Sequence, residues 1–379
     1  MNRLSKIIAA VSFSAILLCG CTDTKPDSFP AQPILLPEAA FTKRLENTYA
    51  EQFTIDRYEH GYSIIHTMDG ESFCIVPEHA AVPEIDGLTV LQQPLDDIYL
   101  TATSAMGLAD ALDCITHIRF SGTKPEDWAI PAAIEAMKQE EMLYAGKYRE
   151  PDYELLLKEG CDLSVQSSMI FHAPEVREQL SALGIPVFID YSSYETHPLG
   201  RSEWIKVYGE IFGKSDAADQ LFSAQASIPQ SLTKPKKETT AAFFYINAAG
   251  QAVTRKSGDY VTQMITIAGG TNIFSNLGDS ENASSSVTLE MEEFYTKAKD
   301  ADFIIYNSTI AGEVNSISEL IAKNPLLADF KAVQNGNVWC TTENLFQETM
   351  QLGTVISDFN RIFTGQTASS PPEFLFRLD

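Results

Sequence analysis

Basic residues are scarce in this sequence of 379 residues. Lysine and arginine together number 27, whereas aspartate and glutamate number 51, which gives a formal net charge of −24. A surface this acidic repels the phosphate groups of nucleic acids and the anionic headgroups of membranes. The composition therefore argues against nucleic-acid binding and against electrostatic adsorption to a membrane.

Beyond the N-terminal 21 residues, closely spaced histidine or cysteine pairs, the usual signs of a metal centre, are also lacking. The six histidines form no His-x-x-His or His-x-x-x-His pair, and the cysteines form no Cys-x-x-Cys pair. Cys74, Cys114, Cys161 and Cys340 are widely spaced in apolar contexts. We therefore expect these four to be unpaired structural residues.

Catalytic signatures are absent as well. The sequence contains no Gly-x-Ser-x-Gly elbow, no His-Glu-x-x-His motif, no P-loop, and no Gly-x-Gly-x-x-Gly turn between a strand and a helix. We therefore expect a protein that binds a ligand, is not an enzyme and needs no cofactor of its own. A lipoprotein enzyme of unknown chemistry is the alternative from another functional class.

Residues 1–20 resemble a bacterial lipoprotein export signal. A basic start precedes an apolar run over 7–18, which is too short to span a bilayer comfortably. The sequence LCGC then resembles a lipobox, in which the small Gly20 precedes a cysteine that becomes lipidated. We expect a lipid on Cys21 and a flexible Pro-rich stalk over 21–37. These features predict a protein on the extracytoplasmic face of the cell membrane, attached only through that lipid.

Strand-like and helix-like stretches alternate beyond the stalk. The first feature is a β-hairpin within 53–76, where an Asp-Gly pair lies between two β-rich runs. Short apolar runs then alternate with helical stretches over 97–190 and again over 240–363. This alternation predicts an N-terminal α/β lobe over 38–212, which includes the hairpin, and a C-terminal α/β lobe over 237–379.

A helical segment joins the two predicted lobes. Apolar residues recur at helical spacing from Arg201 to Phe212, and Ser215 can cap a second helix with its hydroxyl. A Lys-Pro-Lys-Lys sequence ends this segment, because proline cannot continue a helix. We therefore predict one linker helix over 213–236. A cleft should lie between the lobes at the carboxyl ends of the strands, where open α/β sheets bind ligands.

Five stretches, in this order, resemble the substrate-binding lipoproteins of bacterial ABC importers for iron complexes and cobalamin. They are EPDYELLLKEGCDL (150–163), YETHPLGRSEWIK (194–206), AGGTNIF (268–274), ADFIIYN (301–307) and FKAVQNGNVWC (330–340). The resemblance covers roughly residues 50–362 and rests on order and spacing. It implies an α/β fold of two Rossmann-like lobes joined by a single long helix, the clamshell of class III periplasmic binding proteins.

The resemblance also implies a function. Such a protein binds a metal chelate between its lobes, here a ferric siderophore or heme, and delivers it as a monomer to an ABC permease. Cobalamin and a bare zinc or manganese ion are the alternative ligands. Family members dock on the permease through an acidic residue on each lobe. Glu154 and Glu293 match these positions, and Glu292 is the alternative for the second.

Candidate ligand contacts lie beyond the strand ends and where the chain enters the linker. Arg201 is the foremost of them, because a planar guanidinium suits carboxylate, catecholate or propionate oxygens. Aromatic faces suit flat macrocycles, and basic groups suit anionic iron chelates. In a purely structural alternative, Arg201 pairs with Glu195 and Trp204 packs in the core. The complete predicted set is Ser104, Ser168, Tyr194, Glu195, Arg201, Trp204, Tyr245, Arg255, Tyr306 and Asn307.

Overall fold

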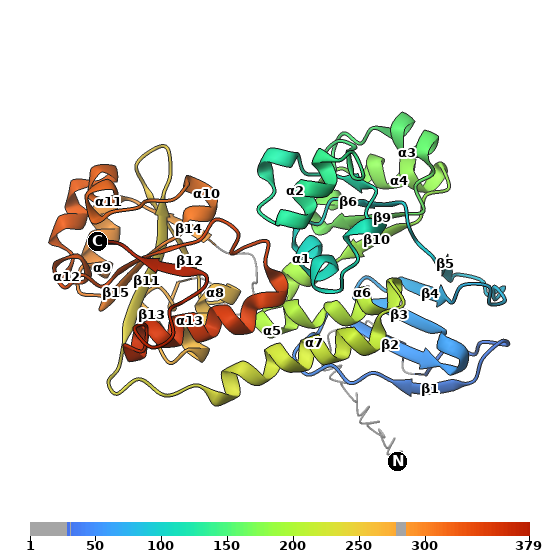
Figure 1. The fold of residues 1–379 in the computed structure, drawn as a ribbon, viewed down its shortest axis with the longest axis horizontal. Coiled ribbons are helices and arrows are strands. Elements are labelled where there is room, and N and C mark those ends of the chain that lie inside the picture. The colour runs from blue at the N-terminus through green and yellow to red at the C-terminus, as the bar shows by residue number, and fades with distance from the viewer. Residues whose placement is uncertain (1–28, 31, 278–285) are drawn as a thin grey trace, which may run out of the picture.

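The computed structural model describes residues 29–30, 32–277 and 286–379. Three β-sheets and the helices around them make up this part of the chain (Figure 1). The expected signal peptide, the lipidation site Cys21 and most of the stalk lie outside the described residues. No helix in the described ranges is both long and apolar enough to cross a bilayer.

An N-terminal sheet of five strands precedes both lobes, in the order β1-β2-β3-β4-β5. Its strands are antiparallel except for the parallel pair β4 and β5. The predicted hairpin corresponds to β3 and β4, and the structure extends it on both sides. The flanking β1 and β5 have only four residues each and mix polar with apolar side chains, so they carry no alternating pattern. The bounds are β1 (Phe41–Arg44), β2 (Phe53–Tyr58), β3 (Ser63–Thr67), β4 (Ser72–Val76) and β5 (Thr89–Gln92).

The two faces of the N-terminal sheet are buried in different cores. Side chains alternate along a strand, so neighbours such as Ile64 and Ile65 point to opposite faces. Ile65 belongs to the large core of the N-terminal lobe, together with Phe53 and Phe73. Ile64 belongs to a small separate core closed by Leu36 from the segment before β1. The sheet is thus an integral part of the N-terminal lobe.

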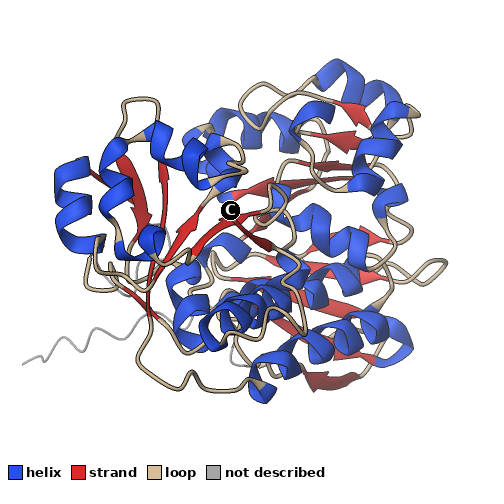
Figure 2. Ribbon diagram, turned by 60° about the vertical axis from the view of Figure 1, so that its left-hand side comes forward, coloured by secondary structure: helices blue, strands red, loops and turns tan. Residues whose placement is uncertain are grey.

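The sheet of the N-terminal lobe is entirely parallel, with strand order β10-β9-β6-β7-β8. Figure 2 shows helices on both sides of the strands, as expected for parallel βαβ units. The strands are β6 (Ile98–Leu100), β7 (Phe120–Ser121), β8 (Leu143–Tyr144), β9 (Leu163–Ser167) and β10 (Val187–Asp190). The helices are α1 (Thr103–Ala111), α2 (Pro131–Lys138), α3 (Tyr153–Glu159) and α4 (Pro174–Ala182).

The sheet of the C-terminal lobe is mixed, with order β14-β12-β11-β15-β16-β17, and β13 pairs with β11. Buried apolar clusters cover both of its faces. The strands are β11 (Thr240–Ile246), β12 (Ala252–Arg255), β13 (Thr271–Asn272), β14 (Ser286–Leu289), β15 (Phe303–Tyr306), β16 (Val338–Thr341) and β17 (Leu375–Arg377). The helices are α8 (Tyr260–Ile267), α9 (Met291–Ala298), α10 (Ser308–Ala311), α11 (Ile317–Lys323), α12 (Lys331–Gln334) and α13 (Leu352–Thr364).

Three consecutive helices lead from the first lobe toward the second: α5 (Pro198–Glu203), α6 (Ile205–Ile211) and α7 (Ser215–Ser227). Helix α7 runs along one side of the molecule toward the C-terminal lobe (Figure 1). The predicted linker boundary at 236 is wrong, because α7 ends at Ser227 and only a short 3-10 turn follows. Pro229 lacks the N–H that the next α-helical hydrogen bond requires.

A second connection between the lobes is the segment that follows β16. The Gln347 side chain accepts a hydrogen bond from the Ala129 N–H at 2.8 Å and donates one to the Asp127 carbonyl at 2.9 Å. A Cβ atom on Gly107 would lie only 2.4 Å from the Gln347 carbonyl oxygen. Glycine at this position therefore allows the segment to lie directly against α1.

Two buried carboxylates attach the chain before β2 to the helices at the base of the linker. Glu203 accepts hydrogen bonds from the N–H groups of residues 48, 49 and 50 at 2.7–2.8 Å, and from Lys206 Nζ at 2.6 Å. Glu195 accepts bonds from the N–H groups of residues 51 and 52. Five consecutive backbone donors thus converge on two side chains from α5 and the turn before it.

Removal of the Glu203 carboxylate should strongly destabilise the protein. In Glu203→Ala, the buried Lys206 ammonium and three backbone N–H groups lose their acceptor. We expect the free energy of unfolding to fall by about 3–5 kcal/mol, as measured by urea denaturation. The control is Glu154→Ala, since Glu154 is exposed and its loss should change little. A Glu203→Ala variant as stable as this control would show that the attachment is unimportant.

Candidate functional site

The carboxyl ends of three parallel strands meet at one edge of the N-terminal lobe. Ser104 lies in the first turn of α1 after β6, Ser168 follows β9, and Ser192 follows β10. The hydroxyls of Ser104 and Ser192 are 3.3 Å apart, and those of Ser168 and Ser193 are 3.4 Å apart. The structure therefore brings the predicted Ser104 and Ser168 to the same edge of the sheet.

A small cavity of about 30 Å³ lies where this edge meets the C-terminal lobe. We call its lining the interlobe floor. Its volume has room for one or two water molecules and not for a chelate. The lining residues come from both lobes and are Ser104, Ser192, Arg201, Tyr260, Leu345, Phe346, Thr349 and Leu352.

Arg201 lies at the centre of the interlobe floor and contacts both lobes. Its Nε donates to the Glu195 carbonyl at 3.2 Å and its Nη2 to the Ser193 carbonyl at 2.7 Å. Its Cζ lies 3.9 Å from the centre of the Tyr260 ring, which is a cation–π contact across the lobes. Among the described residues, no carboxylate forms an ion pair with this guanidinium. Burial lowers the pKa of Arg201.

Arg255 adds a second cation from the C-terminal lobe. Its Cζ lies 5.0 Å from the centre of the Phe346 ring, and its Nη1 lies 3.4 Å from Asp259 Oδ2. Asp259 is buried, and this burial raises the pKa of its carboxyl group. Asp259 pairs with Arg255 only, so the Arg201 guanidinium at the floor remains without an ion pair among the described residues. Such a guanidinium, in a protein of net charge −24, favours an anionic ligand group.

Glu195 and Trp204 support this floor from behind and do not line it. They are 1% and 0% exposed, and Trp204 Nε1 donates to Glu195 Oε1 at 3.0 Å. The structure corrects the expectation that these two side chains contact the ligand. Arg201 bonds to the backbone of Glu195 and not to its carboxylate, so the alternative of an Arg201–Glu195 ion pair is also wrong.

Tyr306 and Asn307 are likewise buried, at 0% exposure each. The Tyr306 ring packs edge-on against Phe244, with ring centres 5.8 Å apart. Asn307 Oδ1 accepts from the Thr309 N–H and caps α10. The structure therefore places both residues beneath the surface, where they do not reach the floor. Tyr245 also lies apart from the floor, in a hollow of the C-terminal lobe.

Exposed aromatic and apolar side chains follow β9 and β10 at the same edge of the N-terminal lobe. Met169, Phe171 and Tyr194 are 44%, 47% and 45% exposed, which is unusual for such side chains. Tyr191 lies between the aromatic rings, 6.2 Å from Phe171 and 5.9 Å from Tyr194. The sequence predicted Tyr194 but missed Phe171, because a short 3-10 turn carries no periodic pattern.

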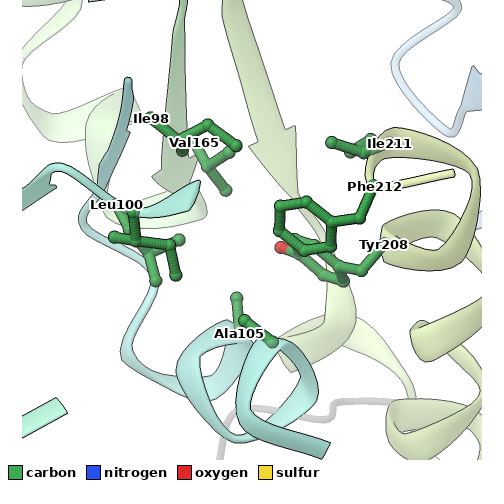
Figure 3. Close-up of a pocket in the computed structure, with 9 residues that line it drawn as sticks. Ile98, Leu100, Ala105, Val165, Tyr208, Ile211 and Phe212 are labelled. Carbon is green, nitrogen blue, oxygen red and sulfur yellow. The ribbon is translucent and has the colours of Figure 1, made fainter. Parts of the chain in front are cut away.

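A second, wholly apolar void lies inside the N-terminal lobe (Figure 3). Tyr208 and Ile211 of α6, with Phe212 directly after it, face Leu100 and Val165 of the sheet across it. The void leaves no room for a water molecule. It is a packing gap of the core and not a binding site.

The two acidic residues predicted to contact a permease lie in equivalent places. Glu154 is exposed in the first turn of α3, and Glu292 and Glu293 are exposed in the first turn of α9. Helix α3 follows the parallel strand β8. Helix α9 follows β14, which runs parallel to β11 because both are antiparallel to β12. Each glutamate therefore lies on the carboxyl edge of its own sheet.

The described residues offer no ligand set for a bare metal ion. Nowhere in the ranges 29–30, 32–277 and 286–379 do three or more histidine, cysteine, aspartate or glutamate side chains gather closely enough to hold one. In the same ranges Cys74, Cys114, Cys161 and Cys340 are free, as predicted.

Comparisons with known proteins agree with this architecture. A sequence profile of a periplasmic binding protein family matches residues 125–345. An uncharacterized lipoprotein of Methanocaldococcus jannaschii is 23% identical over 305 residues, which cover 76% of this chain and 70% of the relative.

Solved structures show the same fold. The periplasmic heme-binding protein HutB of Vibrio cholerae aligns with a TM-score of 0.56 at 18% identity, over 68% of this chain and 96% of HutB. The molybdate-binding protein MolA of Haemophilus influenzae aligns with a TM-score of 0.55 at 15% identity, over 73% and 88%. The family match begins at residue 125, so the N-terminal sheet lies outside it.

Glu195 should make stability depend on pH in a defined window. Burial raises the pKa of Glu195 from 4.5 to about 7, so between these values the native state holds a proton that the unfolded state has lost. The free energy of unfolding should therefore fall as pH rises from 4.5 to about 7, by at most about 1.4 kcal/mol per pH unit.

The Glu195→Gln variant isolates this contribution. Its side chain does not titrate, so its stability relative to the wild type should rise across the same window and stay constant outside it. Urea denaturation of both proteins from pH 4 to pH 8 measures the difference. A difference that does not change with pH would contradict the raised pKa.

Proposed function

The chain belongs to the periplasmic binding protein family, whose members bind substrates for ABC transporters, and on this basis we propose that it binds an iron complex. The complex is a ferric siderophore or heme, captured between the lobes by a monomeric protein and delivered to a permease. This function needs no covalent chemistry and no cofactor. Cobalamin remains the alternative ligand within the same family.

The Arg201 guanidinium at the interlobe floor carries this proposal, because no carboxylate among the described residues forms an ion pair with it. Arg255 adds a second guanidinium beside the floor, paired with Asp259 at 3.4 Å. Ferric catecholates are anionic and heme carries two propionates, so both chelates offer oxygens to a guanidinium. Cobalamin offers a single anionic group, the phosphodiester of its nucleotide loop, and its corrin side chains are neutral amides. The cation pair therefore favours iron complexes over cobalamin.

The exposed apolar residues of the N-terminal lobe support a ligand with a large organic body. Met169, Phe171 and Tyr194 leave apolar area in water that a bound macrocycle or aromatic ligand would cover. A bare metal ion would gain nothing from such a surface. This feature supports a chelate over a free ion.

The proposed location follows from the N-terminus and from the relatives. A lipid on Cys21 would hold the protein on the extracytoplasmic face of the membrane, and the M. jannaschii relative is named a lipoprotein. Glu154 and Glu293 would then contact the permease from the carboxyl edges of the two lobes. Exposed ion pairs of this kind fix orientation and encounter rate more than affinity.

A binding titration tests the ligand. The mature protein without its lipid is titrated with hemin, a ferric catecholate complex, cyanocobalamin, Zn²⁺ and Mn²⁺, followed by tryptophan fluorescence and visible absorbance. We expect saturation by hemin or by the ferric complex, and an affinity about ten-fold weaker in Arg201→Met.

The matched control for this titration is Arg119→Met. Arg119 directly precedes β7 and therefore lies at the opposite edge of the sheet, where it donates to the carbonyls of Glu140 and Glu141. Its loss should not change the affinity. Saturation by Zn²⁺ or Mn²⁺ alone, without a chelate, would refute the proposal.

Charge reversal tests the docking residues. The double variant Glu154→Lys and Glu293→Lys should lose transport by the permease while it keeps wild-type affinity for the iron complex. The control double variant is Glu135→Lys and Glu238→Lys, which makes the same charge change at exposed positions of each lobe. Uptake of radiolabelled iron by cells measures the effect. Equal uptake by both double variants would contradict the assignment.

A further inference from the structure

A hollow of about 580 Å³ opens at the carboxyl edge of the C-terminal sheet. It shares no lining residue with the interlobe floor. Its volume lies within the range of small-molecule sites, about 300–1,000 Å³. The lining comes from the end of β11, the turn after it, α10 and the end of α11, and consists of Tyr245, Ile246, Asn247, Ala248, Gly250, Ile310, Ala311 and Lys323.

Lys323 gives this hollow a positive charge. Its side chain is exposed at the end of α11, and its Nζ lies 5.4 Å from the centre of the Tyr306 ring. In the described part of the chain, no carboxylate lies within ion-pair distance of this ammonium group.

The opposite wall of the hollow is apolar. Ile310 of α10 is 57% exposed, the highest value for a large apolar residue outside the segments around the N-terminal sheet. Ala311 and the half-buried Tyr245 continue this wall. A ligand that covers Ile310 and also neutralises Lys323 must combine an apolar body with an anionic group.

Polar atoms without partners lie just beneath the hollow. Tyr306 Oη and Asn307 Nδ2 are buried, and neither has a hydrogen-bond partner among the described residues. Tyr306 is the residue over which Lys323 lies, and Asn307 begins the helix that carries Ile310. Both residues belong to the strand end beside the hollow and do not line it.

We propose that this hollow is a subsite for an anionic arm, carboxylate or phenolate, of an organic chelator with an apolar body. The inference rests on the proposed function and deepens it. The interlobe floor is too small to hold a chelate, so it binds at most one charged group at the base of the complex. Lys323 then binds a second anionic group, and Ile310 covers the adjoining apolar part.

Two variants test the subsite with hemin and a ferric catecholate complex as the probes. Lys323→Met removes the charge and keeps the length of the side chain. Ala248→Trp places a bulky ring in the hollow from an exposed turn. Whichever of the two probes saturates the wild-type protein, we expect each variant to bind that probe with an affinity about ten-fold weaker. The loss in Lys323→Met should shrink at high salt, whereas the loss in Ala248→Trp should not.

The matched control is Lys297→Met. Lys297 occupies the last turn of α9 in the same lobe, so this change removes the same charge from an equivalent place on a helix. It should leave the affinity unchanged, and Lys323→Arg should retain most of it. Circular dichroism spectra confirm that each variant is folded.

The outcomes separate this inference from the proposed function. If the wild-type protein binds an iron complex and Lys323→Met and Ala248→Trp bind it equally well, the subsite is refuted and the proposed function stands. If Lys297→Met weakens binding as much as Lys323→Met, the effect is one of overall charge and the subsite is again refuted. If the wild-type protein binds neither probe, the proposed function fails and the inference fails with it.

Discussion

The attachment of residues 48–52 to Glu195 and Glu203 is the constraint on which the rest of the structure depends. Five backbone N–H groups donate to these two carboxylates, which are almost completely buried. These hydrogen bonds satisfy polar oxygens that burial removes from water, although at Glu195 the cost of burial still prevails and raises the pKa to about 7. The attachment joins the N-terminal sheet to α5, from which Arg201 reaches Tyr260 of the opposite lobe. A sheet outside the family match thus supports the centre of the proposed site.

Local charge differs from overall charge where the lobes meet. The whole chain is strongly acidic, yet Arg201 at the interlobe floor and Lys323 at the hollow have no ion-pair partner among the described residues. Glu154 and Glu293 lie at exposed positions. Such a distribution suits a protein that attracts an anionic ligand at its centre and presents acidic groups to a membrane partner.

Much of the fold could be predicted from the sequence, because alternating short apolar runs and helical stretches leave few arrangements other than two α/β lobes. The expectation that residues just beyond parallel strands meet at one edge placed Ser104 and Ser168 together. It could not separate Tyr306 and Asn307 from accessible positions, since burial at a strand end depends on what packs above it. The hollow around Lys323 combines three separate segments, within 245–250, 310–311 and at 323, and no spacing in the sequence relates them.

A crystal structure of the mature protein with hemin or a ferric catecholate complex is the most direct test of the central claim. Anomalous scattering from the iron locates the complex independently of its organic part. The account predicts an iron position between the lobes, with an anionic oxygen of the complex within hydrogen-bond distance of the Arg201 guanidinium. Iron bound outside the interlobe region, or a complex that leaves Arg201 untouched, would contradict it.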